Sequence, residues 1–351
     1  MKFSDVLDIR NGRNQRQVEN ANGKYPIYGS GGVMGRATDF ICDAGTVVIG
    51  RKGSINNPFF VDEPFWNVDT AFGLVAHRDV LLPKYLFYFC VNFDFEQLNT
   101  TVTIPSLTKA NLLQIEINVP DMDEQRYVVR VLDKICRLTD LQQQELHNLD
   151  QLVKSRFIEL FASVEAEDTL QNLCTFIDYR GKTPEKVESG LPFITAKNIR
   201  MHRMSFDTLE YISKETYDRV MTRGFPQIGD VVFTTEAPLG NVCRIPFIET
   251  EFYIGQRIIT MQTERLEPAY LEYALSSDEF KRKIAEKSSG STVTGIRSKL
   301  LEQLTIPVPP RALQERFAAF VEQTDKSKLA VQKGLQELEI LKKSLMQQYF
   351  G

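Results

Sequence analysis

The segment LDQLVKSRFIELF (residues 149–161) returns near the end of the chain as LEILKKSLMQQYF (residues 338–350). The two segments align without a gap at an offset of 189 residues. Both carry apolar residues at the three- and four-residue spacing of an amphipathic helix. The same offset relates QIEINVP (residues 114–120) to QLTIPVP (residues 303–309). The match therefore extends over a whole structural unit and not over one helix alone.

Further towards the N-terminus the repeat continues at smaller offsets. GTVV (residues 45–48) matches GDVV (residues 229–232), and YPIY (residues 25–28) matches LPFI (residues 191–194). The shrinking offset indicates that the second copy has gained loop residues. A period of this length exceeds the repeats of solenoid proteins. The sequence therefore predicts two complete domains of one kind, each followed by a long helix.

After Pro120 and Pro309 the hydrophobic pattern changes to a period of 3.6 residues, which predicts two helices of about 35–40 residues, or roughly 50–60 Å. Such helices are longer than one small domain needs, and we expect them to pack on each other as an antiparallel coiled coil with pseudo-twofold symmetry. Two independent domains, each packing its own helix, are the alternative. The apolar residues of the two faces are Val128, Leu132, Ile135, Leu138, Leu146, Leu149, Leu152, Val153 and Leu160, and Phe317, Phe320, Val321, Val331, Leu335, Leu338, Leu341, Leu345 and Tyr349.

The remaining segments read as mixed α/β structure. Short β-type runs bounded by Gly, Pro or Asn, such as residues 45–50 and 229–234, alternate with helical patches. The predicted fold class is α+β, with two homologous domains in tandem. The predicted boundaries are residues 1–120 for the first domain, 121–162 for the central helix, 163–308 for the second domain and 309–351 for the C-terminal helix.

Composition narrows the class of protein. The chain has 351 residues, 42% of them hydrophobic, which is enough for two ordinary cores. No run approaches 18 apolar residues and the N-terminus lacks a secretory signal, so we expect a cytoplasmic protein without a membrane partner. Five scattered cysteines argue against a disulfide framework or a zinc site. Because the net charge is −4, any contact with nucleic acid must be local or shared with a partner.

Several short motifs resemble chemical sites only loosely. The glycine run at residues 29–35 lacks the spacing of a phosphate loop. Residues 57–60 (NPFF) resemble a methyltransferase base-binding box without its second proline, and residues 279–281 (EFK) resemble a nuclease motif without its upstream acid. The three histidines are scattered. We therefore predict no catalytic, cofactor-binding or metal-binding residue in this chain.

A local basic concentration is the strongest candidate for contact with DNA. Between residues 281 and 299 six cations face one acid and surround the small-residue run SSGSTVTG. Small hydroxyl residues let backbone N–H groups approach phosphate, while cations neutralise it. The candidates here are Lys283, Ser291, Thr292 and Arg297, and the matching stretch of the first half contributes Lys109. A solvated basic surface is the alternative.

Loops that follow the matched strands supply further candidates, because their side chains are of the types that read base edges. Taken alone, each of these loops fits an ordinary polar turn about as well as it fits a DNA contact. The candidates in these loops are Arg51, Lys52 and Asn56 in the first half and Thr235, Glu236 and Asn241 in the second. A similar set elsewhere in the second half consists of Arg180, Lys182, Lys197, Asn198 and Arg257.

Taken in order, these features resemble the DNA specificity subunit of type I restriction-modification systems. The resemblance covers the whole chain and lies in the duplicated order of its motifs. These motifs are YPIYGSGG (residues 25–32), NVDTAFG (67–73), the Val-Pro strand ends at 119–120 and 308–310, Gln125 and Gln314, the LxxLxKS repeats, TAKNI (195–199), GDVVF (229–233) and GQR (255–257).

The resemblance implies two target recognition domains that read the two halves of a split site on double-stranded DNA, separated by a coiled-coil spacer. It also implies that catalysis belongs to partners: two methylation subunits carrying S-adenosylmethionine, and a restriction subunit that is an ATP- and Mg-dependent translocase and nuclease. Two rival hypotheses are a nuclease or methyltransferase acting alone, and a tandem scaffold for protein interactions.

Overall fold

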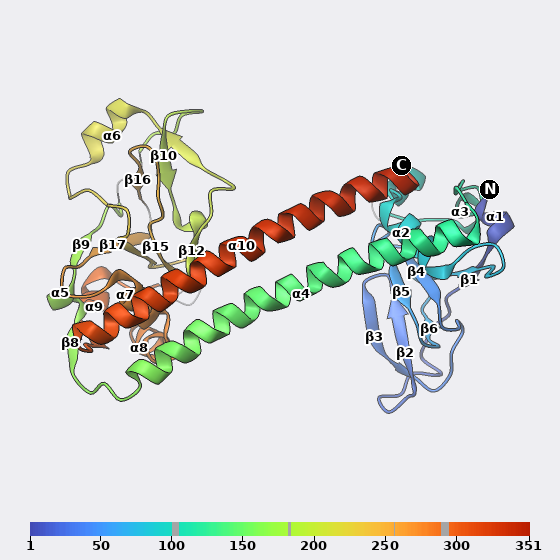
Figure 1. Ribbon diagram of the computed structural model, residues 1–351, viewed down its shortest axis with the longest axis horizontal. Coiled ribbons are helices and arrows are strands. Elements are labelled where there is room, and N and C mark those ends of the chain that lie inside the picture. Colours follow the sequence, from blue (N-terminus) through green and yellow to red (C-terminus); the bar gives the residue numbers. More distant parts are fainter. Residues whose placement is uncertain (100–104, 182–183, 256, 289–294) are drawn as a thin grey trace. The chain divides into compact units, whose positions relative to one another are not determined.

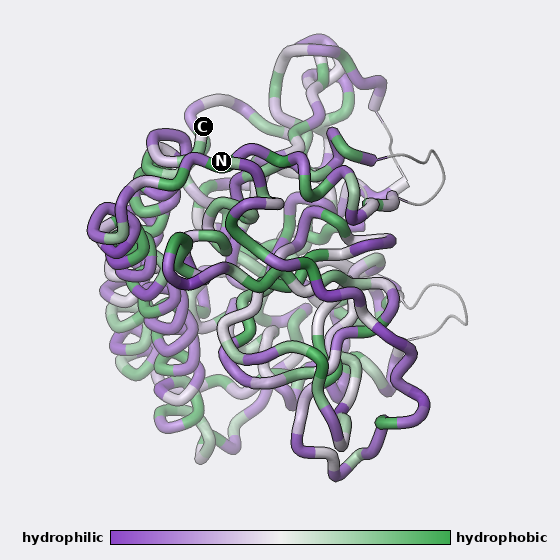
Figure 2. The backbone as a smooth tube through the Cα atoms, turned by 90° about the vertical axis from the view of Figure 1, so that its right-hand side faces the viewer, coloured by the Kyte–Doolittle hydropathy of each residue, from purple (hydrophilic) through white to green (hydrophobic). Residues whose placement is uncertain are grey.

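The computed structural model describes residues 1–99, 105–181, 184–255, 257–288 and 295–351. Two compact units divide the chain: unit 1 contains residues 1–144 and 331–351, and unit 2 contains residues 145–330. Two 40-residue helices, α4 (Met122–Phe161) and α10 (Arg311–Phe350), each continue from one unit into the other (Figure 1). Apolar and polar residues alternate along both helices (Figure 2). None of the helices in the described part of the chain is long and apolar enough to cross a membrane.

Unit 1 is built on two small sheets. One is antiparallel with the order β1-β7-β4-β5, and the other has the order β3-β2-β6 with β2 and β6 parallel. Short helices cover the first sheet. The elements are α1 (Phe3–Val6), β1 (Leu7–Asn11), β2 (Tyr25–Gly29), β3 (Gly32–Ala37), β4 (Thr46–Gly50), β5 (Phe59–Val61), β6 (Trp66–Asn67), β7 (Ala71–Ala76), α2 (Pro83–Asn92), the 3₁₀ helix η1 (Phe95–Leu98) and α3 (Lys109–Leu112).

Unit 2 repeats this plan with additions. Its main antiparallel sheet has the order β15-β14-β17-β9, and a second sheet has the order β13-β10-β16 with β10 and β16 parallel. The elements are β8 (Glu167–Thr169), α5 (Leu170–Leu173), β9 (Thr175–Ile177), β10 (Leu191–Ile194), η2 (Ala196–Asn198), β11 (Ile199–Arg200), β12 (Arg203–Met204), β13 (Glu210–Ile212), α6 (Lys214–Val220), β14 (Val231–Thr234), β15 (Val242–Arg244), β16 (Tyr253–Ile254), β17 (Ile258–Gln262), α7 (Pro268–Ser276), α8 (Asp278–Lys287), α9 (Ser298–Glu302) and β18 (Thr305–Pro307).

The two units share one topology. Strands β1, β7, β4 and β5 occupy the same order as β9, β17, β14 and β15, and the parallel pair of β2 with β6 corresponds to β10 with β16. The matched sequence segments GTVV and GDVV lie in or beside β4 and β14, and YPIY and LPFI form β2 and β10. The prediction of two homologous mixed α/β domains in tandem is therefore confirmed.

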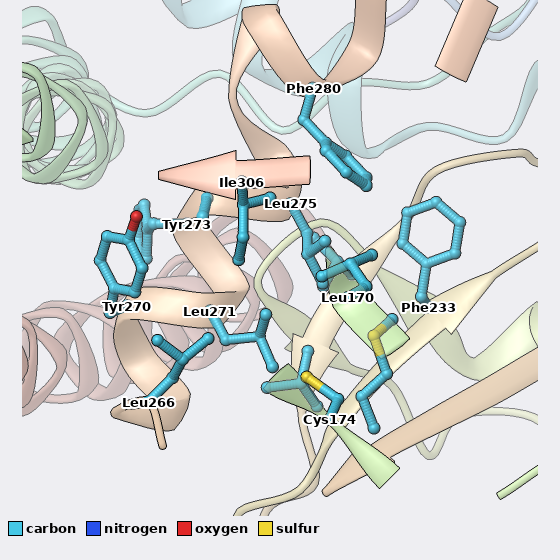
Figure 3. Close-up of a cluster of buried hydrophobic side chains, with 14 of the residues drawn as sticks. Leu170, Cys174, Phe233, Leu266, Tyr270, Leu271, Tyr273, Leu275, Phe280 and Ile306 are labelled. Carbon is cyan, nitrogen blue, oxygen red and sulfur yellow. The ribbon is translucent and has the colours of Figure 1, made fainter. Parts of the chain in front are cut away.

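The core of unit 2 forms between the main sheet and helix α7. Tyr270 and Leu271 of α7 pack with Phe233 of β14 and Ile306 of β18, and each is at most 1% exposed (Figure 3). Large apolar side chains of this kind each contribute about 1.5–3 kcal/mol when they leave water. The Tyr and Leu residues of α7, in the segment PAYLEYA (residues 268–274), are thus core residues, as their helical spacing indicates.

Within unit 2, α4 and α10 run in opposite directions. The ring of Phe157 on α4 packs against Phe317 on α10 with centroids 5.4 Å apart. One to two turns earlier on α4, the carboxylate of Asp150 lies 2.7 Å from the ammonium of Lys328, which is further along α10. The earlier residue on α4 thus contacts the later residue on α10, so the two helices are antiparallel here.

The same arrangement occurs inside unit 1. Val128 and Leu132 at the start of α4 share a buried core with Met346 near the end of α10. Later on α4, Gln142 approaches Gly334, where an added Cβ would lie 2.7 Å from the amide nitrogen of Gln142. The glycine within α10 therefore permits a close approach of the two helices. The predicted antiparallel pairing is confirmed within each unit.

A buried glutamine joins each long helix to the helix that follows the sheet. The amide oxygen of Gln125 on α4 accepts a 2.8 Å hydrogen bond from Leu82 N–H, and its amide nitrogen donates to the carbonyl of Val80 at 2.8 Å. In unit 2, Gln314 on α10 accepts from the N–H of Glu267 at 2.8 Å. These bonds satisfy backbone groups at the N-termini of α2 and α7. The two matched glutamines therefore fix each long helix to the globular part of its unit.

Candidate nucleic-acid interface

In unit 2 several loops meet around Thr235, the residue that follows β14. Thr235 is fully buried, and its N–H donates a 2.8 Å hydrogen bond to the carbonyl of Arg257, just before β17. Its own carbonyl accepts from Ile296 N–H at 3.0 Å, and Glu236 pairs with Gly295 in an antiparallel bridge. The loops after β14, before β17 and before α9 are thereby held together by their backbones.

Arg180, which follows β9, adds a fourth loop to this cluster. Its guanidinium forms a fork on Asp178, with Nε 2.9 Å from Oδ1 and Nη2 2.7 Å from Oδ2, while Nη1 donates to the hydroxyl of Thr235 at 3.4 Å. Burial alone would raise the pKa of Asp178, but hydrogen bonds from the side chain and backbone of Arg180 hold this pKa below its usual value. Arg180 is thus charged, half-buried and fixed in orientation.

Two non-glycine residues of the cluster have left-handed backbones. Arg257 has φ +65° and Ala237 has φ +37°. This region costs an L-residue about 1–2 kcal/mol, and such residues concentrate at functional sites. The side chain of Arg257 is 53% exposed and its Nε lies 3.6 Å from a carboxylate oxygen of Glu236. The cluster therefore presents a paired arginine and carboxylate to solvent.

Unit 1 has the same backbone frame at the matching place. Arg51, which follows β4, donates its N–H to the carbonyl of Thr70 at 2.7 Å and accepts from Leu107 N–H at 2.9 Å. Lys52 pairs with Ser106 in an antiparallel bridge. These contacts repeat, bond for bond, those that Thr235 and Glu236 make in unit 2. The two units thus offer one loop frame twice.

The side chains on the two frames differ in charge and shape. Where unit 2 has Thr235 and Glu236, unit 1 has Arg51 and Lys52, and Thr70 occupies the place of Arg257. A shared frame with different side chains is able to present two different sets of hydrogen-bonding groups to DNA.

Several predicted contact residues reach solvent in the described structure. The guanidinium of Arg51 lies 5.6 Å from the ring centre of Phe72 and is partly exposed. Lys109 starts α3 and donates from its ammonium to the carbonyl of Ile9 at 3.0 Å, which ties it to the end of β1. The other exposed candidates are Lys52, Lys197 and Arg297.

Three predicted readers prove to be internal supports. Asn198 is buried, and its amide nitrogen donates to the carbonyls of Ser205 and Thr208. The amide of Asn241 donates to the carbonyl of Ile199 at 2.9 Å. Thr235 is buried within the frame. Their polar atoms thus satisfy backbone groups of tight loops, and base contact by these three residues stays a prediction.

Lys283 and Asn56 also serve the fold. The ammonium of Lys283 lies 2.8 Å from Glu167 and donates to the hydroxyl and carbonyl of Thr305, which joins α8 to the β8–β18 pair. The amide oxygen of Asn56 accepts from Phe95 N–H at 2.7 Å, at the start of η1. The charge of Lys283 is thus paired within unit 2, and its contact with phosphate stays a prediction. Lys182, Ser291 and Thr292 lie outside the described residues.

Sequence reasoning missed a pocket of about 510 Å³ at the end of β1. Arg10, Asn11, Arg13 and Asp39 supply its polar groups, and Trp66 forms part of the wall. The repeat contained the signal, because the end of β1 corresponds to the end of β9, where Arg180 was predicted. Asp178, which orients Arg180, was missed because a lone aspartate before an arginine has no recognisable pattern.

Among the described residues, no group of three or more His, Cys, Asp or Glu side chains has a metal-binding arrangement. The carboxylate of Glu279 in the EFK motif lies 3.3 Å from Lys283, on the same face of α8. This arrangement is that of a salt-bridged helix surface.

Comparisons with known proteins agree with this architecture. The model of the "Type I restriction modification DNA specificity domain" family matches residues 1–151 and 168–340. The MjaVIII specificity subunit of a type I restriction enzyme from Methanocaldococcus jannaschii is 21% identical over 335 residues, which cover 87% of this chain and 75% of that protein. The putative MjaX specificity subunit of the same organism is 22% identical and covers 78% and 68%.

Solved structures show the same fold. The S subunit of a type I restriction-modification system from M. genitalium superposes with a TM-score of 0.65 at 16% identity, covering 100% of this chain and 95% of that chain. A chain from a structure of type I R-M complex assembly and conformational transition gives 0.59 at 18% identity, covering 100% and 96%. Since the family model matches both tandem copies, this chain belongs to the family of type I restriction-modification DNA specificity proteins.

Proposed function

We propose that the chain reads a bipartite, asymmetric site on double-stranded DNA, with one half-site for each unit. The observation that carries this proposal is the loop frame that occurs in both units with different side chains on it. Residues 1–120 and 163–308 are the proposed recognition domains, and the helical segments 121–162 and 309–351 are the proposed spacer. The chain supplies recognition and no catalysis.

The partners in this proposal are two methylation subunits and one restriction subunit. Matching leucines of the LxxLxKS repeat support the number two: Leu152 is 49% exposed and Leu341 is 48% exposed. Because these equivalent leucines are exposed on two helices, each of them is able to contact one copy of the same partner subunit. Tyr127, Leu138 and Leu141 extend the exposed apolar surface of α4. S-adenosylmethionine would be held by the methylation subunits, and ATP with Mg²⁺ by the restriction subunit.

In this proposal the acidic net charge of −4 is compensated by the methylation subunits, which would complete a basic channel around the duplex. The assembled complex would act on cytoplasmic DNA. On its own the chain would bind DNA weakly and with strong dependence on salt.

Exchange of one domain tests the proposal. Residues 163–308 are replaced by the corresponding domain of a relative, the complex is assembled with methylation subunits, and the modified sites are mapped by sequencing. One half-site should change while the other stays the same. A change in both halves, or in neither, contradicts two separate readers. Methyl transfer or DNA cleavage by the purified chain alone would instead indicate an enzyme.

A further inference from the structure

We propose that Arg257 reads a guanine of the second half-site and that Glu236 holds its guanidinium in position. This inference rests on the proposed function. Among the described residues of unit 2, a left-handed backbone, a paired arginine and three converging loops coincide at Arg257.

The backbone of Arg257 is held in a conformation that this residue type seldom adopts. At φ +65° glycine would be the favoured residue. The structure holds Arg257 there by two hydrogen bonds to its carbonyl from the buried Thr235, one from N–H at 2.8 Å and one from the hydroxyl at 3.3 Å. A long charged side chain at such a position carries a conformational cost, which points to a function for the side chain itself.

The guanidinium of Arg257 is oriented from one side only. Glu236 lies 3.6 Å from Nε, and no described residue accepts a hydrogen bond from either Nη atom. Arg180 differs, because its fork is occupied by Asp178 and its side chain is 23% exposed against 53% for Arg257. Of these two guanidinium groups, that of Arg257 is the more exposed, and the described residues leave its two Nη donors available.

An arginine held in this way fits guanine better than phosphate. The two Nη donors match the O6 and N7 acceptors that guanine presents in the major groove. A phosphate contact would gain nothing from Glu236, whose carboxylate, 42% exposed, would repel it. Gly295 leaves room for the aliphatic stem of Glu236, since an added Cβ would lie 3.3 Å from its Cγ.

The test measures base discrimination by the full chain assembled with its methylation subunits. Rates of methyl transfer are compared on duplexes that carry each of the four bases, or 7-deazaguanine, at every position of the second half-site. Arg257→Gly removes the side chain and suits the observed φ, so it should fold normally, and circular dichroism melting checks this. Arg257→Lys keeps the charge without the fork.

Both Arg257 variants should lose discrimination at a single G·C position by about 5- to 150-fold, the equivalent of 1–3 kcal/mol. The wild-type complex should lose a similar factor on 7-deazaguanine at that position, and the variants should be insensitive to it. Glu236→Gln should retain the same preferred base with weaker discrimination. The exposed Arg297→Ala is the matched control, which should slow methylation equally on all duplexes.

A uniform loss across all duplexes in the Arg257 variants would overturn the inference, because it is the behaviour of a phosphate contact. A change in the first half-site, or lost discrimination in Glu236→Gln with full discrimination in Arg257→Lys, would also overturn it. Failure of the proposed function looks different, since the wild-type complex would then methylate no bipartite site.

Discussion

Removal of the buried carboxylate of Glu272 should strongly destabilise unit 2. Glu272 lies on α7 and is 1% exposed. Its two oxygens lie 2.9 Å from Nδ1 of His202 and 2.6 Å from Nε of Arg244, and Arg244 continues to Asp325 of α10 at 3.0 Å. One carboxylate thus joins the β11–β12 turn, β15 and the long helix.

The loss of stability follows from the groups that Glu272→Ala leaves without the Glu272 carboxylate, namely Arg244 and His202. Loss of one partner of a buried ion pair costs about 3–5 kcal/mol. Because Arg244 keeps Asp325 and is 32% exposed, we expect the lower value, about 3 kcal/mol. For a unit of this size, that corresponds to a fall in melting temperature of about 6–12 °C.

A double-mutant cycle measured by calorimetry checks this reasoning. Glu272→Ala and Arg244→Ala should each destabilise strongly, and the double variant should be less destabilised than their sum by at least about 1.5 kcal/mol. The apolar pair Glu272→Leu with Arg244→Met should recover much of the loss, since it buries no unpaired charge. Additive single effects, or no effect of Glu272→Ala, would refute the network.

Three further outcomes are expected. Gln125→Leu should cost about 2–4 kcal/mol because it leaves backbone groups at the start of α2 unpaired, and calorimetry should show a smaller loss for Gln314→Leu, which removes fewer bonds. The hydrogen bond from Lys283 lowers the pKa of Glu167 in the folded chain, so the ionised carboxylate stabilises unit 2 above pH 4.5. This stabilisation is lost as the pH falls through the lowered pKa, and the free energy of unfolding in denaturant should therefore change less with pH in the acid range for Glu167→Gln. Seven residues inserted after Gln144 and seven before Val331 should lengthen both helices by about 10.5 Å and widen the mapped gap between half-sites by up to about three base pairs, with the half-sites unchanged.

The repeat predicted two domains of one kind because it preserves residues that both units require. The β-branched runs of β4 and β14 lie buried at the centre of each main sheet, and Gln125 and Gln314 satisfy matching backbone groups. Such patterns depend on the spacing of residues along the chain, so they can be recognised from the sequence alone.

Residue type alone does not show which predicted contact residues stay exposed, and the reason is physical. Asn, Thr and Lys have the same polar groups whether they support a loop or face solvent. Asn198 and Lys283 found acceptors on backbone or carboxylate groups inside the chain, whereas Lys52 and Arg297 remained exposed. Polar type alone did not separate these two outcomes.

The amino-acid sequence by itself determined the duplication, the mixed α/β class, the two long helices and the family, because each of these is a periodic or ordered pattern along the chain. Tertiary structure alone decided which loops meet, which of their polar groups stay exposed, and that Arg257 is exposed beside Glu236. It also decided that Glu272, in an apolar helical stripe, is paired with His202 and Arg244. Such pairings join residues far apart in the chain, and they depend on distances that only the folded backbone sets.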